Sequence, residues 1–383
     1  MFELSKTQEE IQKAARGFAK GEFDKDLACE LEKAGEFPEE IWKKAADLGF
    51  INIHFPEKYS GGGMGILESA MIIEEFCRKD SSIGAALALA GYGTECILRF
   101  GTQALKEQYL PLVAKGEMLS GGAFTETQRG AEYTRIETTA VKQGNEWVIN
   151  GTKTNVINGG KAGFYVVLCQ TDIAADISEK GKSMILVESN CPGLSVQKNG
   201  KKLGGNMTST ATLTFENVIV PAKNLVGKEG GGYPQMIIFL DESRILMAAQ
   251  SLGTALGSFD RVLGYTKERV QFKKKLAEFQ ISRHKIAQMA TEIELARLIT
   301  YKAAWSRDQG KIDTKLTSMA KMTAARTAME VGAQTIQLFG GYGYMTEYEV
   351  ERYYRDAKVM ELHEGARDTQ KDIIAQDVIG KIR

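Results

Sequence analysis

Two carboxylates flank a histidine in the segment ELHEGARDTQ, residues 361–370, and they are the side chains best suited to acid–base chemistry. Glu364 stands directly before Gly365, and Glu361 lies three residues earlier. A carboxylate buried against apolar groups has a raised pKa, which suits a general base working near neutral pH. His363 lies between them, but a lone histidine is more often a packing or hydrogen-bonding residue. If one carboxylate is a base that removes a proton from a substrate, another group must accept the electron pair that remains on the substrate.

A pair of glycines, Gly340 and Gly341 in QLFGGYGY, is the second distinctive feature. Glycine lets the backbone approach another group closely, and it is also common just past the end of a helix. A Rossmann-type phosphate loop fits less well, because no strand precedes the pair. The pair therefore indicates a helix end that can lie against a ligand.

The elements that must position these residues follow the order helices, strands, helices. The last proline is Pro234, and the proline-free tail is rich in Ala, Met, Leu, Lys and Glu, which predicts long helices. The middle contains four β-branched or aromatic runs separated by turn residues. No helices intervene, which favours a small barrel or sandwich over parallel βαβ units. These runs are EWVINGTKTNVING, FYVVLCQT, SMILVES and ATLTFENVIVP.

We therefore predict an α+β protein whose three regions pack as one body. They are an N-terminal helical domain at residues 1–119, a β-domain at 120–230 and a C-terminal helical domain at 231–383. Ser5, followed by Gln8, predicts a capping box at the start of the first helix.

Composition excludes several classes of function. Lys plus Arg and Asp plus Glu both number 49, so no overall field favours nucleic acid or anionic lipid. The first residues lack the pattern of a signal peptide, and no segment has the apolar length of a membrane span. The five cysteines are scattered without CxxC spacing, which argues against a disulfide framework or a metal site. We expect a cytoplasmic protein with structural cysteines.

Several motifs together resemble the acyl-CoA dehydrogenase family, and the resemblance covers nearly the whole chain. A set of motifs in the family's order is far more specific than any one of them. The motifs are GGAFTETQRGAE from Gly121, FLDESR from Phe239, ERVQFKKKLAEFQ from Glu268, QLFGGYGY from Gln337 and YYRDAKVMELHEG from Tyr353.

The resemblance implies the family's architecture and partners. It implies an N-terminal helical domain, a middle β-barrel or sandwich domain and a C-terminal four-helix bundle, assembled as a homotetramer. FAD would lie between domains and subunits, an acyl-CoA would be the substrate, and an electron-transfer flavoprotein would be the oxidant.

The resemblance also implies roles for single residues. Glu364 matches the base that removes the α-proton of the acyl-CoA, and its N–H, with a ribityl hydroxyl of FAD, would stabilise the thioester oxygen. Gly365 falls among the substrate-binding positions. Asp241 and Arg244 match residues that contact the CoA portion, and a structural ion pair between them is the alternative.

Further positions match contacts to FAD. Arg269 and Phe272 correspond to residues that reach the FAD of a neighbouring subunit. The other matching positions are Phe124, Thr125, Gly130, Ile157, Gln337, Gly340 and Gly341.

Departures from the family pattern concentrate at the flavin. The usual aromatic residue is Asn155, and the Thr or Ser expected near flavin N5 is Ile157, which has no hydroxyl to donate. The usual glycine after the RxxF segment is Lys273. Other changed positions are Ala131, Ala366, Arg367 and Asp368.

These departures leave two hypotheses. The first is an FAD-dependent acyl-CoA dehydrogenase with a modified flavin pocket. The second is a homologue that binds CoA thioesters with little or no FAD, acting as a non-redox enzyme through Glu364 or as the partner subunit of a hetero-oligomer. A purely structural module is disfavoured, because the base is retained.

Glu95, in ALALAGYGTECILRFG, lies on a predicted helix that resembles the family's acyl-binding helix. An exposed helix acid is the simpler interpretation, because charged groups are seldom buried unpaired. If Glu95 faces the substrate, it would pair with a polar acyl end or act as a second base.

Overall fold

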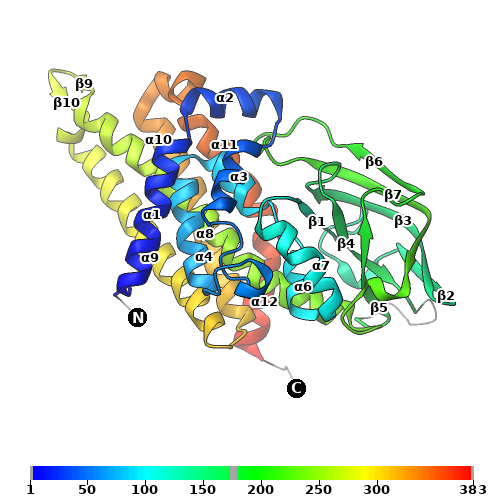
Figure 1. Cartoon of the computed structure of the whole chain (residues 1–383). Helices are drawn as coiled ribbons and strands as arrows, with labels where there is room; N and C mark the ends of the chain where they lie inside the picture. The colour runs from blue at the N-terminus through cyan, green and yellow to red at the C-terminus, as the bar shows by residue number, and fades with distance from the viewer. Residues whose placement is uncertain (1–2, 173–178, 381–383) are drawn as a thin grey trace.

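The N-terminal region is helical in the computed structural model, which describes residues 3–172 and 179–380 (Figure 1). The predicted capping box is present, since the Gln8 N–H donates to Ser5 Oγ (3.2 Å) and the Ser5 N–H to Gln8 Oε1 (2.9 Å). The helices are α1 Lys6–Glu22, α2 Lys25–Ala34, α3 Glu39–Asp47, α4 Ile66–Lys79, α5 Ser81–Ala88, α6 Thr94–Phe100 and α7 Gln103–Ala114.

One eight-stranded sheet forms the middle region, at the right of Figure 1. Its strand order is β6-β7-β3-β2-β4-β5-β8, and β1 pairs with β4 in parallel. The strands are β1 Ser120–Ala123, β2 Thr139–Gln143, β3 Glu146–Ile157, β4 Phe164–Gln170, β5 Lys182–Glu188, β6 Leu194–Lys198, β7 Thr210–Pro221 and β8 Leu225–Val226.

Strand β4 shows how the sheet joins the helices. Its side chains point alternately to the two faces of the sheet, yet residues 164–169 are all buried. Phe164 and Val166 pack with residues of α6, α7 and α8, whereas Tyr165 and Val167 pack inside the β-domain. A strand covered on both faces reads as a continuous apolar run.

The C-terminal region is a helical bundle with a small hairpin. Phe272 and Lys273 form the hairpin turn with φ of 50° and 65°, a conformation that glycine adopts more easily. The sequence predicted only helices here, so the hairpin is a correction. The elements are α8 Gly232–Glu268, β9 Val270–Gln271, β10 Lys274–Lys275, α9 Gln280–Asp308, α10 Thr314–Phe339, α11 Val350–Leu362 and α12 Arg367–Ile379.

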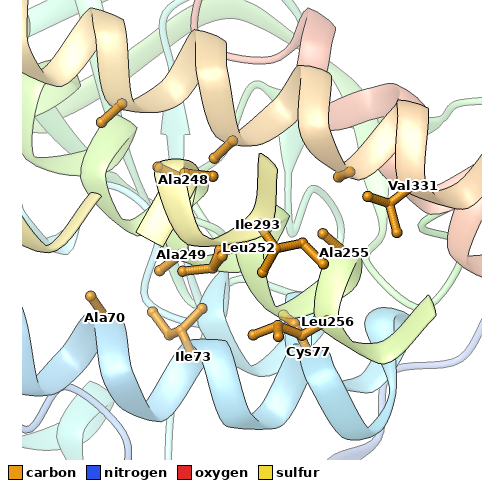
Figure 2. Packing of buried hydrophobic residues seen from close by; sticks show 14 of the residues in the cluster. Ala70, Ile73, Cys77, Ala248, Ala249, Leu252, Ala255, Leu256, Ile293 and Val331 are labelled. Atoms are coloured by element: carbon orange, nitrogen blue, oxygen red, sulfur yellow. The ribbon is translucent and has the colours of Figure 1, made fainter. Parts of the chain in front are cut away.

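Helix α8 is the centre of the helical core, between α4, α9 and α10. Figure 2 shows Ile73 and Cys77 of α4 facing Leu252 and Leu256 of α8. A Cβ added at Gly253 would lie 2.3 Å from Glu74 O, so a side chain there would force α4 and α8 apart. This packing fixes the helix that carries several site residues.

The predicted order of helices, strands and helices is confirmed. The four predicted strand runs correspond to β3, β4, β5 and β7. The sheet is one folded surface whose β3–β7 and β4–β5 halves enclose a shared core, in keeping with the expected compact β-domain. Within residues 3–172 and 179–380, no helix combines the length and the apolar character required to cross a bilayer.

Candidate active site

A large cavity of about 1040 Å³, here called the main cavity, lies where the three regions meet. Its wall includes Ala85 and Leu89 from the α5 segment, Met247 from α8 and the turn between α11 and α12. The β-domain contributes residues of β3, β6 and β7 and the loop after β1. Ligand sites commonly occur in large cavities between domains.

Glu364 reaches the main cavity because the chain turns sharply after α11. Its φ is 59°, and that of Gly365 is 100°. A left-handed conformation costs a residue other than glycine of the order of 1 kcal/mol, and such strain is concentrated at functional sites. A Cβ on Gly365 would lie 2.7 Å from Gln370 Nε2, whose amide donates to Glu364 O at 3.1 Å. The glycine therefore allows the turn and its bracing contact.

The carboxyl group of Glu364 is buried and only partly satisfied. Ser243 Oγ donates to Glu364 Oε1, whereas Oε2 is buried without a hydrogen-bond partner among the described residues. Burial raises the pKa of Glu364 to about 7, while Ser243, Arg244 and Lys321 act in the opposite direction. A carboxylate with this pKa and an unpaired oxygen suits proton abstraction near neutral pH.

Lys321 supports the same turn from α10. Its ammonium donates to Gly365 O at 2.8 Å and to Glu361 O at 3.2 Å. Burial lowers the pKa of Lys321 to about 8, against the opposing effect of Glu364. Glu361 itself pairs with Lys358 at 2.7 Å and does not line the main cavity. Only one carboxylate of the ELHEG segment therefore faces the cavity.

His363 also lines the main cavity, with its ring centroid 5.4 Å from that of Tyr92. Burial, with a smaller effect from Lys321, lowers the pKa of His363 to about 4. The imidazole is therefore neutral near pH 7 and acts as a wall of the cavity.

The predicted loop and strand positions meet at this cavity. Phe124, Thr125, Gly130, Ile157 and Gly365 all line it. The sequence therefore located both the carboxylate and the opposing wall.

Asn155 lines the main cavity at a bulge in β3. Its φ is 54°, a left-handed conformation that asparagine tolerates better than a large aromatic residue does. Its side-chain oxygen accepts a hydrogen bond from Asn199 Nδ2 at 3.0 Å. An amide pair thus occupies the place where the resemblance leads one to expect an aromatic ring.

Asp241 and Arg244 do not line the main cavity. Both are buried, and Arg244 Nη1 lies 3.2 Å from Asp241 Oδ1. Arg244 Nε donates to Glu364 O at 3.3 Å. This geometry keeps both residues off the main cavity, although Asp241 lines a separate small cavity with residues of α9 and α10. It matches the alternative of an ion pair and adds a brace for the Glu364 turn.

The remaining predicted FAD positions lie at a distant end of the bundle. Arg269 stacks over the Tyr342 ring at 5.1 Å, and Phe272 is 88% exposed. Figure 1 shows this end, marked by β9 and β10, opposite the β-domain. Within one chain, the following residues do not join the main cavity: Arg269, Phe272, Gln337, Gly340 and Gly341.

Glu95 is buried, which corrects the simpler interpretation of an exposed helix acid. It does not line the main cavity but a separate small one, where His54 Nε2 lies 3.6 Å from its Oε1.

Several wall residues escaped the sequence analysis. A sequence signal exists for only one of them, Lys202, which lies in the glycine-rich run NGKKLGG, residues 199–205. The missed residues are Tyr92, Tyr133, Thr154, Lys202, Met247, Gln250, Asp356 and Thr369.

The wall suits a large ligand such as FAD. A Cβ at Gly130, Gly200 or Gly205 would meet nothing within 4 Å, so their backbone lies bare on the cavity. Such bare backbone permits the close approach of a cofactor. The hydroxyl of Thr125 and the amides of Asn155 and Asn199 add polar groups. Within the described part of the chain, no group of three or more His, Cys, Asp or Glu could hold a metal ion.

Comparisons with known proteins agree over all three regions. Models of the acyl-CoA dehydrogenase N-terminal, middle and C-terminal domains match residues 5–117, 121–218 and 230–379. The acryloyl-CoA reductase (NADH) of Anaerotignum propionicum is 39% identical over 99% of this chain and 96% of its own length. The short-chain-specific acyl-CoA dehydrogenase of Clostridium acetobutylicum is 38% identical over 98% of each chain.

Solved structures share the fold closely. One described as the electron transferring flavoprotein of Acidaminococcus fermentans has a TM-score of 0.95 at 35% identity, with 100% of both chains covered. An FAD-dependent dehydrogenase has a TM-score of 0.92 at 30% identity, with 99% of both chains covered. These matches over the whole length show that the chain belongs to the acyl-CoA dehydrogenase family of enzymes.

Proposed function

We propose that the protein catalyses α,β-dehydrogenation of an acyl-CoA thioester, with Glu364 as the base and FAD as the hydride acceptor. The observation that carries this proposal is the unpaired Oε2 of Glu364, buried at the main cavity with a pKa near 7. The relatives named as an acyl-CoA dehydrogenase and an acryloyl-CoA reductase support CoA thioesters as the substrate class.

The chain's own groups account for the proton transfer. Glu364 takes the α-proton, and negative charge grows on the thioester oxygen. The Glu364 N–H donates to no other group in the described part of the chain, so it is available to that oxygen. The wall formed by Phe124, Thr125 and Ile157 would hold FAD, and a bound FAD would supply a hydride acceptor for the β-hydrogen, so that loss of the proton and the hydride would leave a Cα–Cβ double bond. Tyr92 and Phe124 line the cavity and exclude water around the reacting carbons.

The test is the spectrum of the purified protein and its response to substrate. We expect flavin absorbance near one FAD per chain and bleaching on anaerobic addition of a suitable acyl-CoA. A fully loaded protein that no acyl-CoA in a broad panel reduces would contradict the proposed reaction.

The alternative of a protein with little or no FAD stays open because of one side chain in the cavity wall. Ile157 lines the main cavity and offers no hydroxyl to a flavin. A protein that remains colourless after incubation with FAD, yet binds CoA thioesters, would favour this second candidate.

Ile157→Thr tests the flavin pocket directly. A new hydroxyl would add one hydrogen bond of about 1 kcal/mol, so we expect FAD to bind roughly fivefold tighter. Titration of the apoprotein with FAD, followed by flavin fluorescence, measures the change. Val156→Thr, at a neighbouring buried position that does not line the cavity, is the control. Unchanged FAD affinity in Ile157→Thr would place the flavin elsewhere.

The partners follow from the same proposal. The solved relative named for an electron transferring flavoprotein supports such a protein as the oxidant. The distant cluster around Arg269 and exposed Phe272 suits contact with the FAD of a neighbouring copy, consistent with a homotetramer.

Lys321→Met is expected to shift the pH dependence of proton abstraction. The Lys321 charge lowers the pKa of Glu364, so its removal raises that pKa above about 7. The base is active when deprotonated, and the acidic limb of kcat/KM should therefore move to higher pH by about half to one unit. Lys315→Met is the matched control, because Lys315 lies on the same helix but pairs with Asp377. An unmoved acidic limb would remove Lys321 from the electrostatics of the base.

A further inference from the structure

A second, smaller cavity of about 40 Å³, here called the polar chamber, contains Glu95. It lies among α4, α5, α6, α8 and the segment before α4. Most of its wall is apolar. Four polar side chains interrupt that wall: Asn52, His54, Ser69 and Glu95.

The polar groups of the chamber are buried but incompletely paired. The His54 and Glu95 side chains are 4% and 9% exposed. His54 Nδ1 lies 3.0 Å from Ser69 Oγ, which orients the ring, and the 3.6 Å from His54 Nε2 to Glu95 Oε1 is too long for a hydrogen bond. His54 Nε2 and Asn52 Nδ2 have no hydrogen-bond partner in the described part of the chain. Buried polar groups are rarely left this way.

The chamber lies directly behind the wall of the main cavity. Ala88 lines the chamber, whereas the adjacent Leu89 and, one turn earlier, Ala85 line the main cavity. On α8, Leu246 lines the chamber and the next residue, Met247, lines the main cavity. Two helices thus present neighbouring residues to both spaces.

The charges of the two sites also interact. Burial is the main cause of the raised pKa of Glu364, and the carboxylate of Glu95 adds to it. Glu95 is therefore near enough to the proposed base to affect it.

We propose that the polar chamber receives the distal end of the acyl group, and that this end carries a hydrogen-bond donor such as a hydroxyl. The inference rests on the proposed function, since it takes an acyl-CoA as the substrate. Glu95 Oε1 would accept the donor's hydrogen, and the donor's oxygen would accept from Asn52 Nδ2 or His54 Nε2–H. An acyl group that ends in a carboxylate is disfavoured, because Glu95 would repel it. The volume holds two or three water-sized groups, so only a small end fits.

The first test compares thioesters of equal backbone length in the unmodified protein. Acyl-CoAs with four, five and six carbons would each carry a methyl, hydroxyl or carboxylate end, and calorimetry would give the Kd of each. At the length that fits, we expect the hydroxyl end to bind at least about tenfold more tightly than the methyl end, because a methyl leaves the buried polar groups unpaired. The carboxylate end should bind most weakly.

Variants then assign that preference to the chamber. Glu95→Leu should abolish the preference for the hydroxyl end and leave binding of the methyl-ended thioester unchanged or tighter. Glu68→Leu is the control, because Glu68 precedes Ser69 on α4 but does not line the chamber. His54→Phe provides a second variant if Glu95→Leu does not fold.

The outcomes separate this inference from the proposed function. Equal Kd values for methyl and hydroxyl ends at every length would overturn the inference and show that the chamber holds only water. A preference that survives in both Glu95→Leu and His54→Phe would also overturn it. Failure of every thioester to bind would instead remove the proposed function.

Discussion

Glu364→Gln is expected to abolish turnover while leaving CoA-thioester binding nearly unchanged. Glutamine keeps the size of the side chain and its contact with Ser243, but its amide has no basic oxygen to take the α-proton. The loss should appear in kcat, by roughly a thousandfold, with little effect on Kd. Exchange of the α-proton with solvent deuterium, followed by NMR, measures the proton step separately from any redox step.

Glu361→Gln is the matched control for this prediction. Glu361 lies three residues earlier, but its carboxylate pairs with Lys358 and faces away from the main cavity. Turnover and α-proton exchange of Glu361→Gln should stay within about twofold of the parent protein, since this partly exposed ion pair is remote from the reacting atoms and such pairs contribute little. Substantial exchange in Glu364→Gln would locate the base at another carboxylate, and Glu95 would be the next to test.

The pH dependence of Glu364 follows from its surroundings. Burial raises its pKa to about 7, above that of the exposed side chain, so the folded protein binds a proton that the unfolded chain has released. Between those two pKa values, rising pH therefore removes stability while it produces the active base. Burial of Glu364 therefore gives a base that is active near neutral pH and lowers the free energy of unfolding at that pH.

The sequence predicted the parts of the site that depend on local motifs. Glu364 and Gly365 were found because YYRDAKVMELHEG resembles a family motif whose base stands directly before a glycine. Phe124 and Ile157 were found because the motif GGAFTETQRGAE and the segment after it resemble the family's flavin-contacting positions. In each case the relevant signal lies within a few residues of the chain.

The features of the site that the sequence did not predict depend on contacts between elements that are distant in the chain. Nothing in the sequence around Glu95 indicates that its side chain lies in a cavity lined by residues of α4 and α8, which is why its burial was not expected. The contact between His54 and Ser69 joins a loop to a helix and has no spacing signature. The left-handed conformation of Asn155 arises from a bulge in the pairing of β3 with β7.

Arg244→Met is expected to reduce both stability and turnover, and it distinguishes a structural brace from a CoA contact. The substitution leaves the buried Asp241 carboxylate with only the hydroxyls of Thr314 and Thr317. Removing one partner of a buried ion pair costs about 3 kcal/mol, so the free energy of unfolding should fall by that amount. Denaturant unfolding followed by circular dichroism measures it.

The kinetic effect of Arg244→Met should lie in kcat. Arg244 braces Glu364 O and its charge lowers the pKa of Glu364, so the variant should have a looser base with a pKa above about 7. The acidic limb of the pH profile should therefore move to higher pH. KM should change little, because Arg244 does not line the main cavity.

Two further variants isolate the cause. Arg244→Lys keeps the charge but lacks the planar fork that reaches both Asp241 and Glu364, so it should retain the parent pH profile while losing stability. Arg297→Met breaks an ion pair with buried Glu74, remote from the cavity wall, and should lose stability without a shift in the pH profile. A large rise in KM for Arg244→Met, with unfolding unchanged, would instead restore Arg244 as a contact to CoA.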